Sequence, residues 1–475
     1  MKKTKIVSTL GPASGTVEIV SNLIEAGTNV FRFNFSHGDH AEHLERINMV
    51  HEAEKKTGKT VGLLLDTKGA EIRTTVQSGE TGKLQFSQGD KVIISMDDTL
   101  EGTNEKIAVT YPGLFDDVEV GGTVLFDDGD IGMTILAKDE ANRELSMEVQ
   151  NDGILGSRKG VNAPGVSINL PGITERDADD IKFGLDNGIN FIAASFVRKP
   201  EDVNDIRKIL VENGKEDVLI MPKIESQEGI DNFDAILEVS DGLMVARGDM
   251  GVEIPPENVP QVQKELIRKM NAAGKPVITA TDMLDSMQEN PRPTRAEISD
   301  IENAVLDRTD TTMLSGESAN GSYPVEAVQM MANANEKAES LLKDFGRRMD
   351  GLFDENSATE SLAAAVKKLA DSDEVAAIVT STASGATARL ISKHRPEKPI
   401  VAITYDERVQ RSLTMNYAVY PFMETAPNTV DDMIDLAKKV AVDKGFAKKG
   451  DKIVISAGIP MNQTGTTNLL TIQTI

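Results

Sequence analysis

The sequence predicts an α/β protein: a (β/α)₈ TIM barrel, a small β-barrel domain inserted in one barrel loop, and a C-terminal α/β domain. Three observations lead to this prediction. Eight short apolar runs rich in β-branched residues lie in the first three quarters of the 475-residue chain, each followed by a helical pattern. Residues 70–170 break that rhythm, and a further alternation of strands and helices follows residue 342.

The predicted barrel strands are continuous and apolar, which is typical of a parallel sheet covered by helices on both faces. Eight strand–helix units of this kind predict a closed barrel, which we assign to residues 1–69 and 171–342. The strands are expected at residues 5–8, 28–33, 61–65, 190–195, 218–223, 242–246, 276–280 and 311–314.

Residues 70–170 are expected to form the inserted β-rich domain. Turn signals such as Gly121-Gly122 and Asp127-Asp128-Gly129 separate its short strand-like runs. An insertion at a barrel loop indicates a lid over the barrel. The strand-like runs lie at residues 91–96, 123–126, 132–136 and 145–150.

Residues 343–475 are expected to fold as a separate, doubly wound α/β domain. Its clearest helix runs from residue 430 to 443, where apolar residues recur with helical period and Thr429 can cap the first turn. Its strands are predicted at residues 376–380, 399–404 and 452–456.

The composition excludes several classes of protein. Lys and Arg number 51 against 76 Asp and Glu, a net charge of −25, which argues against nucleic acid or an anionic membrane surface as a partner. The absence of cysteine excludes disulfides and thiol catalysis, and fits a cytoplasmic location. No apolar run is long enough for a spanning helix, and the apolar run near the start is too short for a secretory signal.

Catalytic residues of (β/α)₈ barrels lie at the C-terminal ends of the strands, and this sequence places polar residues there. Because side chains alternate along a strand, Arg32, Asn34 and Ser36 share one face of the second strand. Lys223 and Glu225 likewise share a face of the fifth. The other polar strand ends are Asp66, Thr67, Lys68, Glu71 and Arg73; Arg247, Gly248 and Asp249; Thr281 and Asp282; and Ser315 and Glu317.

Each of these residues alone could be a solvated loop charge, but six such strand ends favour one shared site. An arginine, a lysine and two carboxylates suit a phosphorylated anion bridged by a divalent cation, because Mg²⁺ prefers carboxylate oxygens. The net charge opposes anion binding, so the local cations must dominate. At 4 Å an opposite pair of charges is worth about 4 kcal/mol at an effective dielectric constant near 20.

Eight motifs of the chain, in order, resemble the pyruvate kinase family. The resemblance covers nearly the whole chain and includes the inserted domain and a C-terminal regulatory domain. It implies a kinase that transfers the phosphoryl group of phosphoenolpyruvate to ADP, yielding ATP and, after protonation of the enolate, pyruvate, as the last step of glycolysis. It also implies a homotetramer. The motifs are RFNFSHG, DTKGAEIRT, KGVNAPG, MPKIESQEGI, DGLMVARGDMGVEIP, PVITATDML, PRPTRAEISD and MLSGESANGSYPVEA.

Two other functions would share part of this pattern. A metal-dependent lyase acting on phosphoenolpyruvate or an oxoacid would use the same metal ligands, but it needs neither the nucleotide lid nor Arg32 and Arg73. A catalytically silent metabolite sensor would be expected to lack Lys223, Glu225 or Thr281, and this sequence retains all three.

The resemblance implies roles for the residues at the strand ends. Glu225 and Asp249 would hold Mg²⁺ (or Mn²⁺), while Lys223 and Arg32 would neutralise the transferring phosphoryl group. The amides of Gly248 and Asp249 would take the substrate carboxylate. Thr281 would deliver the proton to the enolate, and because a threonine hydroxyl is a weak acid, a water relay to Ser315 and Glu317 is expected.

The resemblance also implies a nucleotide site and a K⁺ site. A family position where lysine accompanies independence from K⁺ is Glu71 in this chain, which predicts activation by K⁺. The nucleotide residues would be Asn34, His37, Arg73 and Lys159, and the K⁺ ligands Asn34, Ser36, Asp66 and Thr67.

The segment from Thr380 to Thr387 joins a strand to a helix with small hydroxyl residues and a glycine. Such a segment is an ordinary capped loop or a phosphate cradle, and the resemblance favours a site for a phosphorylated sugar or nucleotide activator. Lys393, Arg395 and Arg408 are further candidate phosphate ligands. The effector residues would be Thr382, Ser384, Gly385, Thr387, Gly465 and Thr466.

Four positions depart from the family pattern: Ala70, Asp282, Glu302 and Arg308. Arg308 stands where a glycine is usual. If that position needs a positive φ, the arginine is expected to be strained. Ala70 is expected to loosen the lid hinge, Asp282 to alter a subunit contact or the proton relay, and Glu302 and Arg308 to affect a subunit interface.

Overall fold

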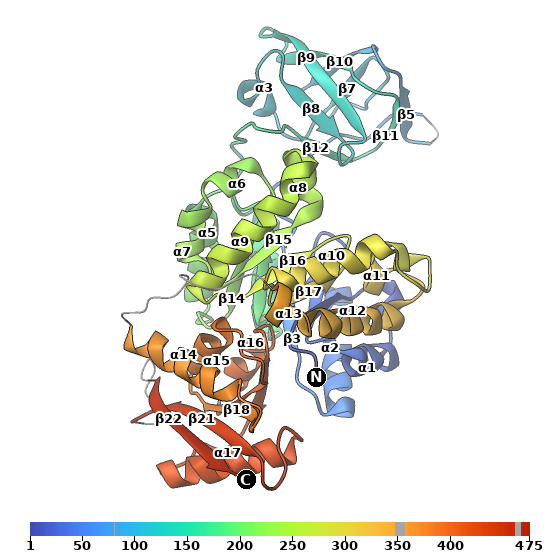
Figure 1. Ribbon diagram of the computed structural model, residues 1–475. Coiled ribbons are helices and arrows are strands. Elements are labelled where there is room, and N and C mark those ends of the chain that lie inside the picture. Colours follow the sequence, from blue (N-terminus) through green and yellow to red (C-terminus); the bar gives the residue numbers. More distant parts are fainter. Residues whose placement is uncertain (80, 347–356, 461–466) are drawn as a thin grey trace.

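The structure is a computed structural model that describes residues 1–79, 81–346, 357–460 and 467–475. The predicted fold class is confirmed: a barrel lies in the middle, with the inserted β-rich domain at one end and the C-terminal α/β domain at the other (Figure 1). Within the described ranges, no helix is both long and apolar enough to cross a membrane.

Eight parallel strands close the barrel in the order β1-β17-β16-β15-β14-β13-β3-β2. Each predicted strand is confirmed to within two residues at either end. On neighbouring strands Asn34 lies beside Asp66, so their side chains emerge at the same rim. The strands are β1 (Lys5–Thr9), β2 (Val30–Asn34), β3 (Gly62–Asp66), β13 (Phe191–Ala194), β14 (Leu219–Ile224), β15 (Leu243–Ala246), β16 (Val277–Ala280) and β17 (Thr311–Leu314).

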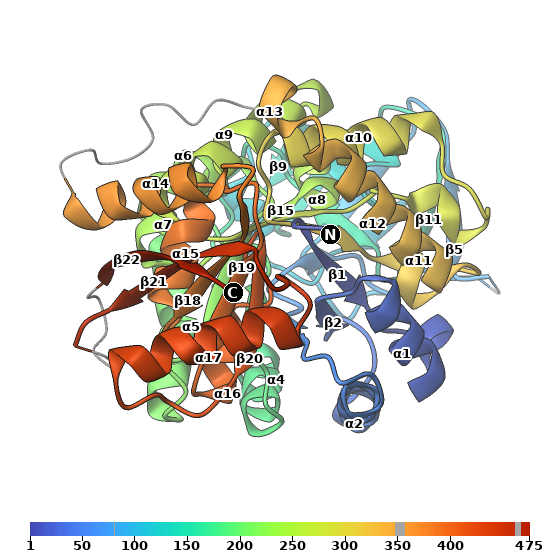
Figure 2. The same cartoon turned by 60° about the horizontal axis from the view of Figure 1, so that its bottom comes forward.

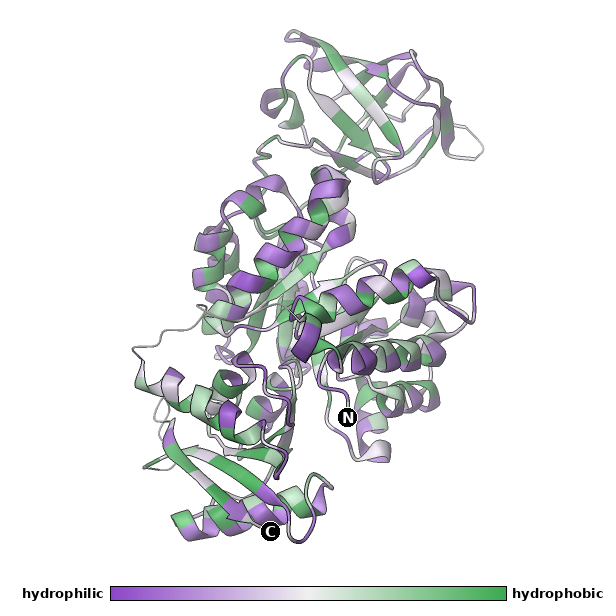
Figure 3. Ribbon diagram, viewed as in Figure 1, coloured by the Kyte–Doolittle hydropathy of each residue, from purple (hydrophilic) through white to green (hydrophobic). Residues whose placement is uncertain are grey.

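Both faces of the barrel sheet are buried, because the side chains of its strands are apolar on each face. The surrounding helices turn their polar faces outward (Figure 3). The helices of this region are α1 (Val17–Ala26), α2 (His40–Thr57), α4 (Glu175–Asp186), α5 (Pro200–Glu212), α6 (Gln227–Asp231), α7 (Phe233–Val239), α8 (Arg247–Glu253), α9 (Val259–Ala273), α10 (Arg295–Leu306), α11 (Gly316–Ala319), α12 (Pro324–Glu339) and α13 (Leu342–Phe345), with 3₁₀ turns at Pro12–Ser14, Pro256–Asn258 and Asp285–Gln288.

The inserted domain has its own core, which includes Phe86, Phe115 and Phe126. A seven-stranded sheet surrounds that core together with a two-stranded sheet and α3 (Leu114–Asp117). The large sheet has the order β4 (Ile72–Arg73), β12 (Gly160–Asn162), β8 (Thr123–Phe126), β9 (Ile131–Asp139), β10 (Glu144–Val149), β6 (Lys91–Ser95) and β7 (Lys106–Ala108), and the small one pairs β11 (Gly153–Gly156) with β5 (Lys83–Phe86).

The C-terminal domain is a five-stranded sheet flanked by helices. The predicted helix is confirmed as α17 (Val430–Asp443), and Thr429 caps it in a reciprocal box with Asp432. The edge strands β20 and β22 were not predicted. In order, the strands are β20 (Val419–Met423), β19 (Ile400–Thr404), β18 (Val375–Ser381), β21 (Lys452–Gly458) and the antiparallel β22 (Thr467–Thr474); the other helices are α14 (Ala358–Ala370), α15 (Ala386–Lys393) and α16 (Glu407–Ser412).

The C-terminal domain lies against the end of the barrel where the chain begins (Figure 2). Met415 joins the apolar cluster inside the barrel, so this domain closes the barrel floor. Arg395, a candidate phosphate ligand, is instead buried at this junction and paired with Asp310. Arg308 has a φ of 77°, the positive value for which strain was expected. Its carbonyl accepts hydrogen bonds from Arg395 and Asn271.

Candidate active site

Four charged side chains from three barrel strands meet at the C-terminal rim of the barrel. The Nε of Arg32 donates to Oδ2 of Asp66 at 2.6 Å. The Nζ of Lys223 lies 3.5 Å from Oδ1 of Asp66 and 2.9 Å from Oε1 of Glu225. None of the four is more than 11% exposed. The predicted convergence of Arg32, Lys223 and Glu225 is therefore present, and it is organised around Asp66.

The charges in this cluster alter one another's proton affinity. Burial would raise the pKa of Asp66, but Lys223 and Arg32 outweigh burial and hold that pKa below its ordinary value. Burial would lower the pKa of Lys223, but Asp66, Glu225 and Asp249 raise it. Lys223 is therefore a fixed positive charge.

The pKa of Glu225 is shifted in the opposite direction to that of Asp66. Burial, with a further contribution from Asp249, raises the pKa of Glu225 to about 8, even though Lys223 opposes the shift. A second cation beside Glu225 would stabilise the ionised form of this carboxyl group. Asp249 stands in the first turn of α8 and is partly exposed.

The donor set fits a hard divalent cation. Among the described residues there is no group of three or more His, Cys, Asp or Glu side chains that could enclose a metal. Mg²⁺ is usually held by one or two carboxylates, with waters and substrate oxygens at its other positions. Glu225 and Asp249 match that requirement as two carboxylates, of which Glu225 is buried and Asp249 is partly exposed and lines a cavity.

Thr281 follows β16 and has a φ of 68°. Its hydroxyl donates to the carbonyl of Ala280 at 2.6 Å and accepts from the amide of Gly248 at 2.8 Å. The Gly248 amide, expected to take a substrate carboxylate, is thus engaged by Thr281. Glu317 accepts from the amides of Ser315 at 2.7 Å and Leu284 at 3.0 Å, and burial raises its pKa.

Ser195, at the end of the fourth barrel strand, was missed by the sequence reasoning. Its hydroxyl donates to the Thr67 carbonyl at 2.7 Å and accepts from Nζ of Lys223 at 2.9 Å. The amide of Phe196 donates to Oε2 of Glu225 at 2.6 Å. The position of Ser195 at a strand end was the available signal, since the same criterion selects the other polar strand ends.

The residues expected to bind K⁺ lie at the ends of β2 and β3. The side-chain oxygen of Asn34 accepts from the Ser36 amide at 3.1 Å, and the Thr67 hydroxyl accepts from the Ser195 amide at 3.1 Å. Asp66 is shared with the Arg32 cluster. The oxygens of the expected K⁺ ligands therefore lie at the same rim of the barrel, although most of them already form a hydrogen bond or ion pair within the protein.

Glu71 is paired more fully than the sequence indicated. Its carboxylate accepts from Nε and Nη2 of Arg73 at 2.7 and 2.9 Å, and Nζ of Lys68 lies 3.2 Å away. Its negative charge is therefore compensated by two cationic side chains in this arrangement.

The candidate nucleotide residues are divided between the barrel and the inserted domain. Lys159 pairs with Asp127 at 2.9 Å. Asp128 beside it has a raised pKa because of burial and the nearby charges of Asp249 and Asp127. Asp249, an expected metal ligand, belongs to the barrel, so the inserted domain faces this part of the barrel rim. His37 is exposed at the turn that follows β2.

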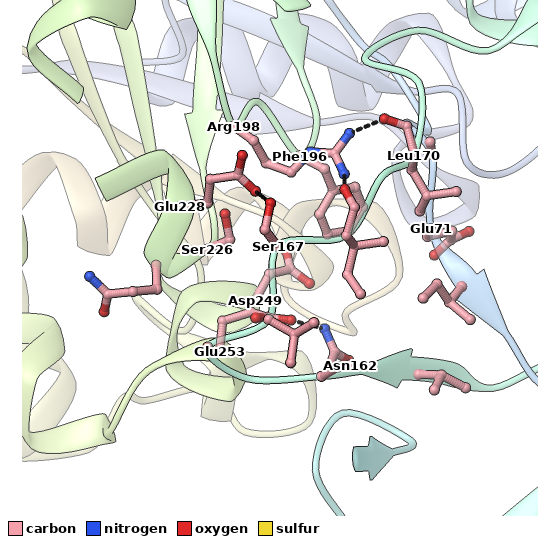
Figure 4. A pocket seen from close by; sticks show the side chains of 18 of the residues that line it. Glu71, Asn162, Ser167, Leu170, Phe196, Arg198, Ser226, Glu228, Asp249 and Glu253 are labelled. Atoms are coloured by element: carbon pink, nitrogen blue, oxygen red, sulfur yellow. Dashed lines mark hydrogen bonds between the residues drawn. The ribbon is translucent and has the colours of Figure 1, made fainter. Parts of the chain in front are cut away.

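A cavity of about 260 Å³ lies between the inserted domain and the barrel (Figure 4). Asn162 donates to Glu253 across it at 2.7 Å, and Ser167 donates to Glu228 at 2.9 Å. Asp249 and Glu71 also line it. Two hydrogen bonds therefore join the walls of this cavity.

The candidate effector loop is ordered by its own side chains. The Thr382 hydroxyl accepts from the Gly385 amide at 3.0 Å, and Gly385 begins α15 with a φ of 80°. The Thr387 and Thr467 hydroxyls lie 2.8 Å apart. The candidates Gly465 and Thr466 lie outside the described residues.

The cationic candidates near the effector loop have acidic partners. Lys393 pairs with Glu360. Arg408 pairs with Asp406 at 2.8 Å and Asp217 at 3.4 Å. The effector loop is instead contacted by Arg389, whose Nη2 donates to the Ser384 carbonyl at 2.7 Å.

Comparison with known proteins identifies relatives along the whole chain. Residues 1–328 match the family model of the pyruvate kinase barrel domain, and residues 360–473 match that of the pyruvate kinase alpha/beta domain. The chain is 60% identical over 478 residues to a pyruvate kinase of Lactobacillus delbrueckii subsp. bulgaricus, covering 100% of this chain and 81% of that protein. It is 49% identical over 500 residues to one from Lactococcus lactis subsp. lactis, covering 100% and 99%.

A solved structure agrees with these relatives. The crystal structure of a pyruvate kinase from Cryptosporidium parvum superimposes with a TM-score of 0.92 at 38% identity, covering 100% of this chain and 96% of that one.

Proposed function

Because the chain belongs to the pyruvate kinase family, we propose that its charged barrel rim transfers the phosphoryl group of phosphoenolpyruvate to ADP, forming ATP and pyruvate. The observation that carries this proposal is a chain of ion pairs: Arg32 contacts Asp66 at 2.6 Å, and Lys223 lies 3.5 Å from Asp66 and 2.9 Å from Glu225. Such a site stabilises a transferring phosphoryl group by charge and position, with little covalent chemistry asked of the protein.

Arg32 and Lys223 are the proposed cationic groups of the transfer. Lys223 is anchored by Ser195 and two carboxylates, so it remains charged and fixed where negative charge develops on the phosphoryl and enolate oxygens. Glu225 and Asp249 are the proposed ligands of Mg²⁺ or Mn²⁺, which when bound would supply charge stabilisation to the substrate oxygens.

Thr281 is the proposed donor of the proton that converts the enolate into pyruvate. Its hydroxyl lies beside the Gly248 amide, on the strand end next to α8. A threonine hydroxyl is too weak an acid to act alone, so water would resupply its proton from the region of Ser315 and Glu317. Burial raises the pKa of Glu317 above its ordinary value, which is the direction that a proton-supplying group requires.

The inserted domain is the proposed nucleotide lid. Arg73 and Lys159 would face the ADP phosphates from the lid, with Asn34 and His37 on the barrel side. The contacts of Asn162 with Glu253 and of Ser167 with Glu228 support a lid that docks on the barrel.

K⁺ is the proposed monovalent activator, with Asn34, Ser36, Asp66 and Thr67 as ligands. The C-terminal domain is proposed to bind a phosphorylated sugar or nucleotide at Thr382, Ser384, Gly385 and Thr387, with Gly465 and Thr466 added by resemblance. We further propose that the enzyme is a cytoplasmic homotetramer, which light scattering of the purified protein tests.

A coupled assay tests the reaction. Purified protein is given phosphoenolpyruvate, ADP, Mg²⁺ and K⁺, with and without AMP and a panel of sugar phosphates, and pyruvate and ATP are measured. We expect pyruvate and ATP in equal amounts only when both substrates are present. Consumption of phosphoenolpyruvate without ADP would instead indicate a lyase, and binding without turnover would indicate a silent sensor.

A further inference from the structure

We propose that Arg247 is a positioning residue for proton delivery: its guanidinium holds the backbone on both sides of Thr281. This inference rests on the proposed function, in which Thr281 supplies the proton. In the sequence, Arg247 is one more cation among the polar strand ends. In the structure, it bonds to the turn after β16.

The turn that carries Thr281 is conformationally strained. Thr281 and Asp282 are consecutive non-glycine residues with φ values of 68° and 55°. A positive φ is unfavourable for any L-residue and most of all for a β-branched one such as threonine. Such a conformation persists only where surrounding contacts hold it, and these sites cluster where function requires them.

Arg247 makes the contacts that hold this turn. Its Nε donates to the Ala280 carbonyl at 3.0 Å, and its Nη2 donates to the Thr281 carbonyl at 2.5 Å. These two carbonyls flank the Cα of Thr281 in the chain. The planar guanidinium therefore bridges the residue whose side chain is proposed to react.

The guanidinium is itself fixed from two helices. Its Nη1 pairs with Oδ1 of Asp300 on α10 at 2.7 Å and lies 3.4 Å from Oε1 of Gln263 on α9. All three nitrogens are thus engaged, and the side chain is only 13% exposed. Arg247 is therefore committed to protein partners through its whole guanidinium group.

One hydrogen bond shows how this arrangement serves proton transfer. The Thr281 hydroxyl currently donates to the Ala280 carbonyl at 2.6 Å. To donate its proton to the enolate, the hydroxyl must rotate away from the Ala280 carbonyl. A buried carbonyl that is left without a hydrogen-bond donor costs free energy. Because Nε of Arg247 also donates to this carbonyl, the Thr281 hydroxyl can turn without leaving it unpaired.

The test separates protonation from phosphoryl transfer. By microscopic reversibility, the protonation step catalyses exchange of the pyruvate methyl hydrogens with deuterium in D₂O, which NMR follows with Mg²⁺, K⁺ and inorganic phosphate present. In Arg247→Lys, one nitrogen cannot bridge both carbonyls. We expect exchange to fall about 10-fold to 100-fold, as for a displaced reacting group, and the KM for phosphoenolpyruvate to stay within about threefold of wild type.

Two further variants address folding and charge. Arg247→Ala leaves a space for free guanidinium ion, which is expected to restore part of the exchange in this variant and none in Thr281→Ala. Asp300→Asn keeps an oxygen acceptor for Nη1 but removes its charge, and a severalfold loss of exchange is expected.

The matched control is Arg207→Lys. Arg207 also pairs with a carboxylate and a carbonyl, those of Asp241 and Val239, near the opposite end of the barrel, and its replacement should leave exchange unchanged. Exchange at the wild-type rate in Arg247→Lys, with Thr281→Ala impaired, would overturn the role of Arg247 alone. Normal exchange in Thr281→Ala would overturn the proposed role of Thr281 as well.

Discussion

Asp310 and Arg395 form a two-point ion pair that fastens the C-terminal domain to the floor of the barrel. Oδ1 of Asp310 accepts from Nη1 of Arg395 at 2.6 Å, and Oδ2 accepts from Nη2 at 2.7 Å. The side chains are only 5% and 3% exposed. Asp310 also accepts from the amides of Val277 and Tyr417, so one carboxylate joins the barrel and the C-terminal domain.

Asp310→Asn should destabilise the protein strongly, because it leaves the Arg395 charge buried without its counter-charge. Breaking such a pair typically lowers the free energy of unfolding by about 3–5 kcal/mol, and urea denaturation measures the change. Asp443→Asn is the control, since the Lys439–Asp443 pair lies exposed on α17 and its loss should not be measurable. Equal effects of the two substitutions would contradict the prediction.

Lys223→Met should lower turnover by about 10²-fold to 10³-fold, the loss typical when a donor to developing charge is removed. The coupled assay measures it, and kcat should fall more than affinity for phosphoenolpyruvate. Lys59→Met is the control, because Lys59 pairs with Glu25 on the surface at 2.6 Å. An effect on KM alone would show that Lys223 only binds substrate.

Glu71→Lys should abolish the need for K⁺, since the introduced ammonium group supplies the positive charge near the rim. Glu71→Gln removes the same negative charge without adding a cation, and it should remain inactive without K⁺. Both also lose the ion pair with Arg73, so their comparison isolates the added charge. Activity is measured with and without K⁺ at constant ionic strength. A wild-type protein that is fully active without any monovalent cation rules out this K⁺ site.

His43 should make the protein less stable in mild acid. Burial lowers its pKa to about 4 although the hydrogen bond to the His37 carbonyl opposes the shift, whereas the unfolded chain keeps a value near 6.5. Between these values the unfolded chain binds a proton that the folded chain does not. Stability is therefore full above pH 6.5 and is lost as the pH falls toward 4, by at most about 1.4 kcal/mol per pH unit.

His43→Phe isolates this contribution, because phenylalanine keeps the stacking on Phe35 but binds no proton. Its unfolding free energy should vary less between pH 4.5 and 7 than that of the wild type. The control His51→Gln replaces another histidine of α2, one that is partly exposed. Identical pH slopes for wild type and His43→Phe would show that His43 does not contribute.

Ser384→Glu should weaken activation by a phosphorylated effector while basal activity persists. Ser384 contacts Arg389 through its backbone carbonyl, so its side chain can change without breaking that bond. An added carboxylate repels a phosphate, and the effector concentration for half activation should rise about tenfold or more. Ser361→Glu adds the same charge on an exposed face of α14. Unchanged activation in Ser384→Glu would exclude this loop as the effector site.

Local patterns were enough to predict the barrel strands and the rim residues. A strand's two-residue period fixes which side chains share a face, so Arg32 and Asn34, and Lys223 and Glu225, could be placed together from their spacing alone. The edge strands β20 and β22 were missed because their runs are half exposed and carry a weaker apolar signal.

The sequence by itself therefore determined the order of elements and the rim on which the charged groups stand, because both follow from short-range periodicity and strand direction. Only the tertiary structure decided which partners those groups take: Ser195 with Lys223, Glu71 with Arg73, Arg395 with Asp310, and Arg247 with the Thr281 turn. Most of these contacts join residues far apart in the chain. Closure of the barrel and docking of the C-terminal domain set their distances, and no local pattern encodes those distances.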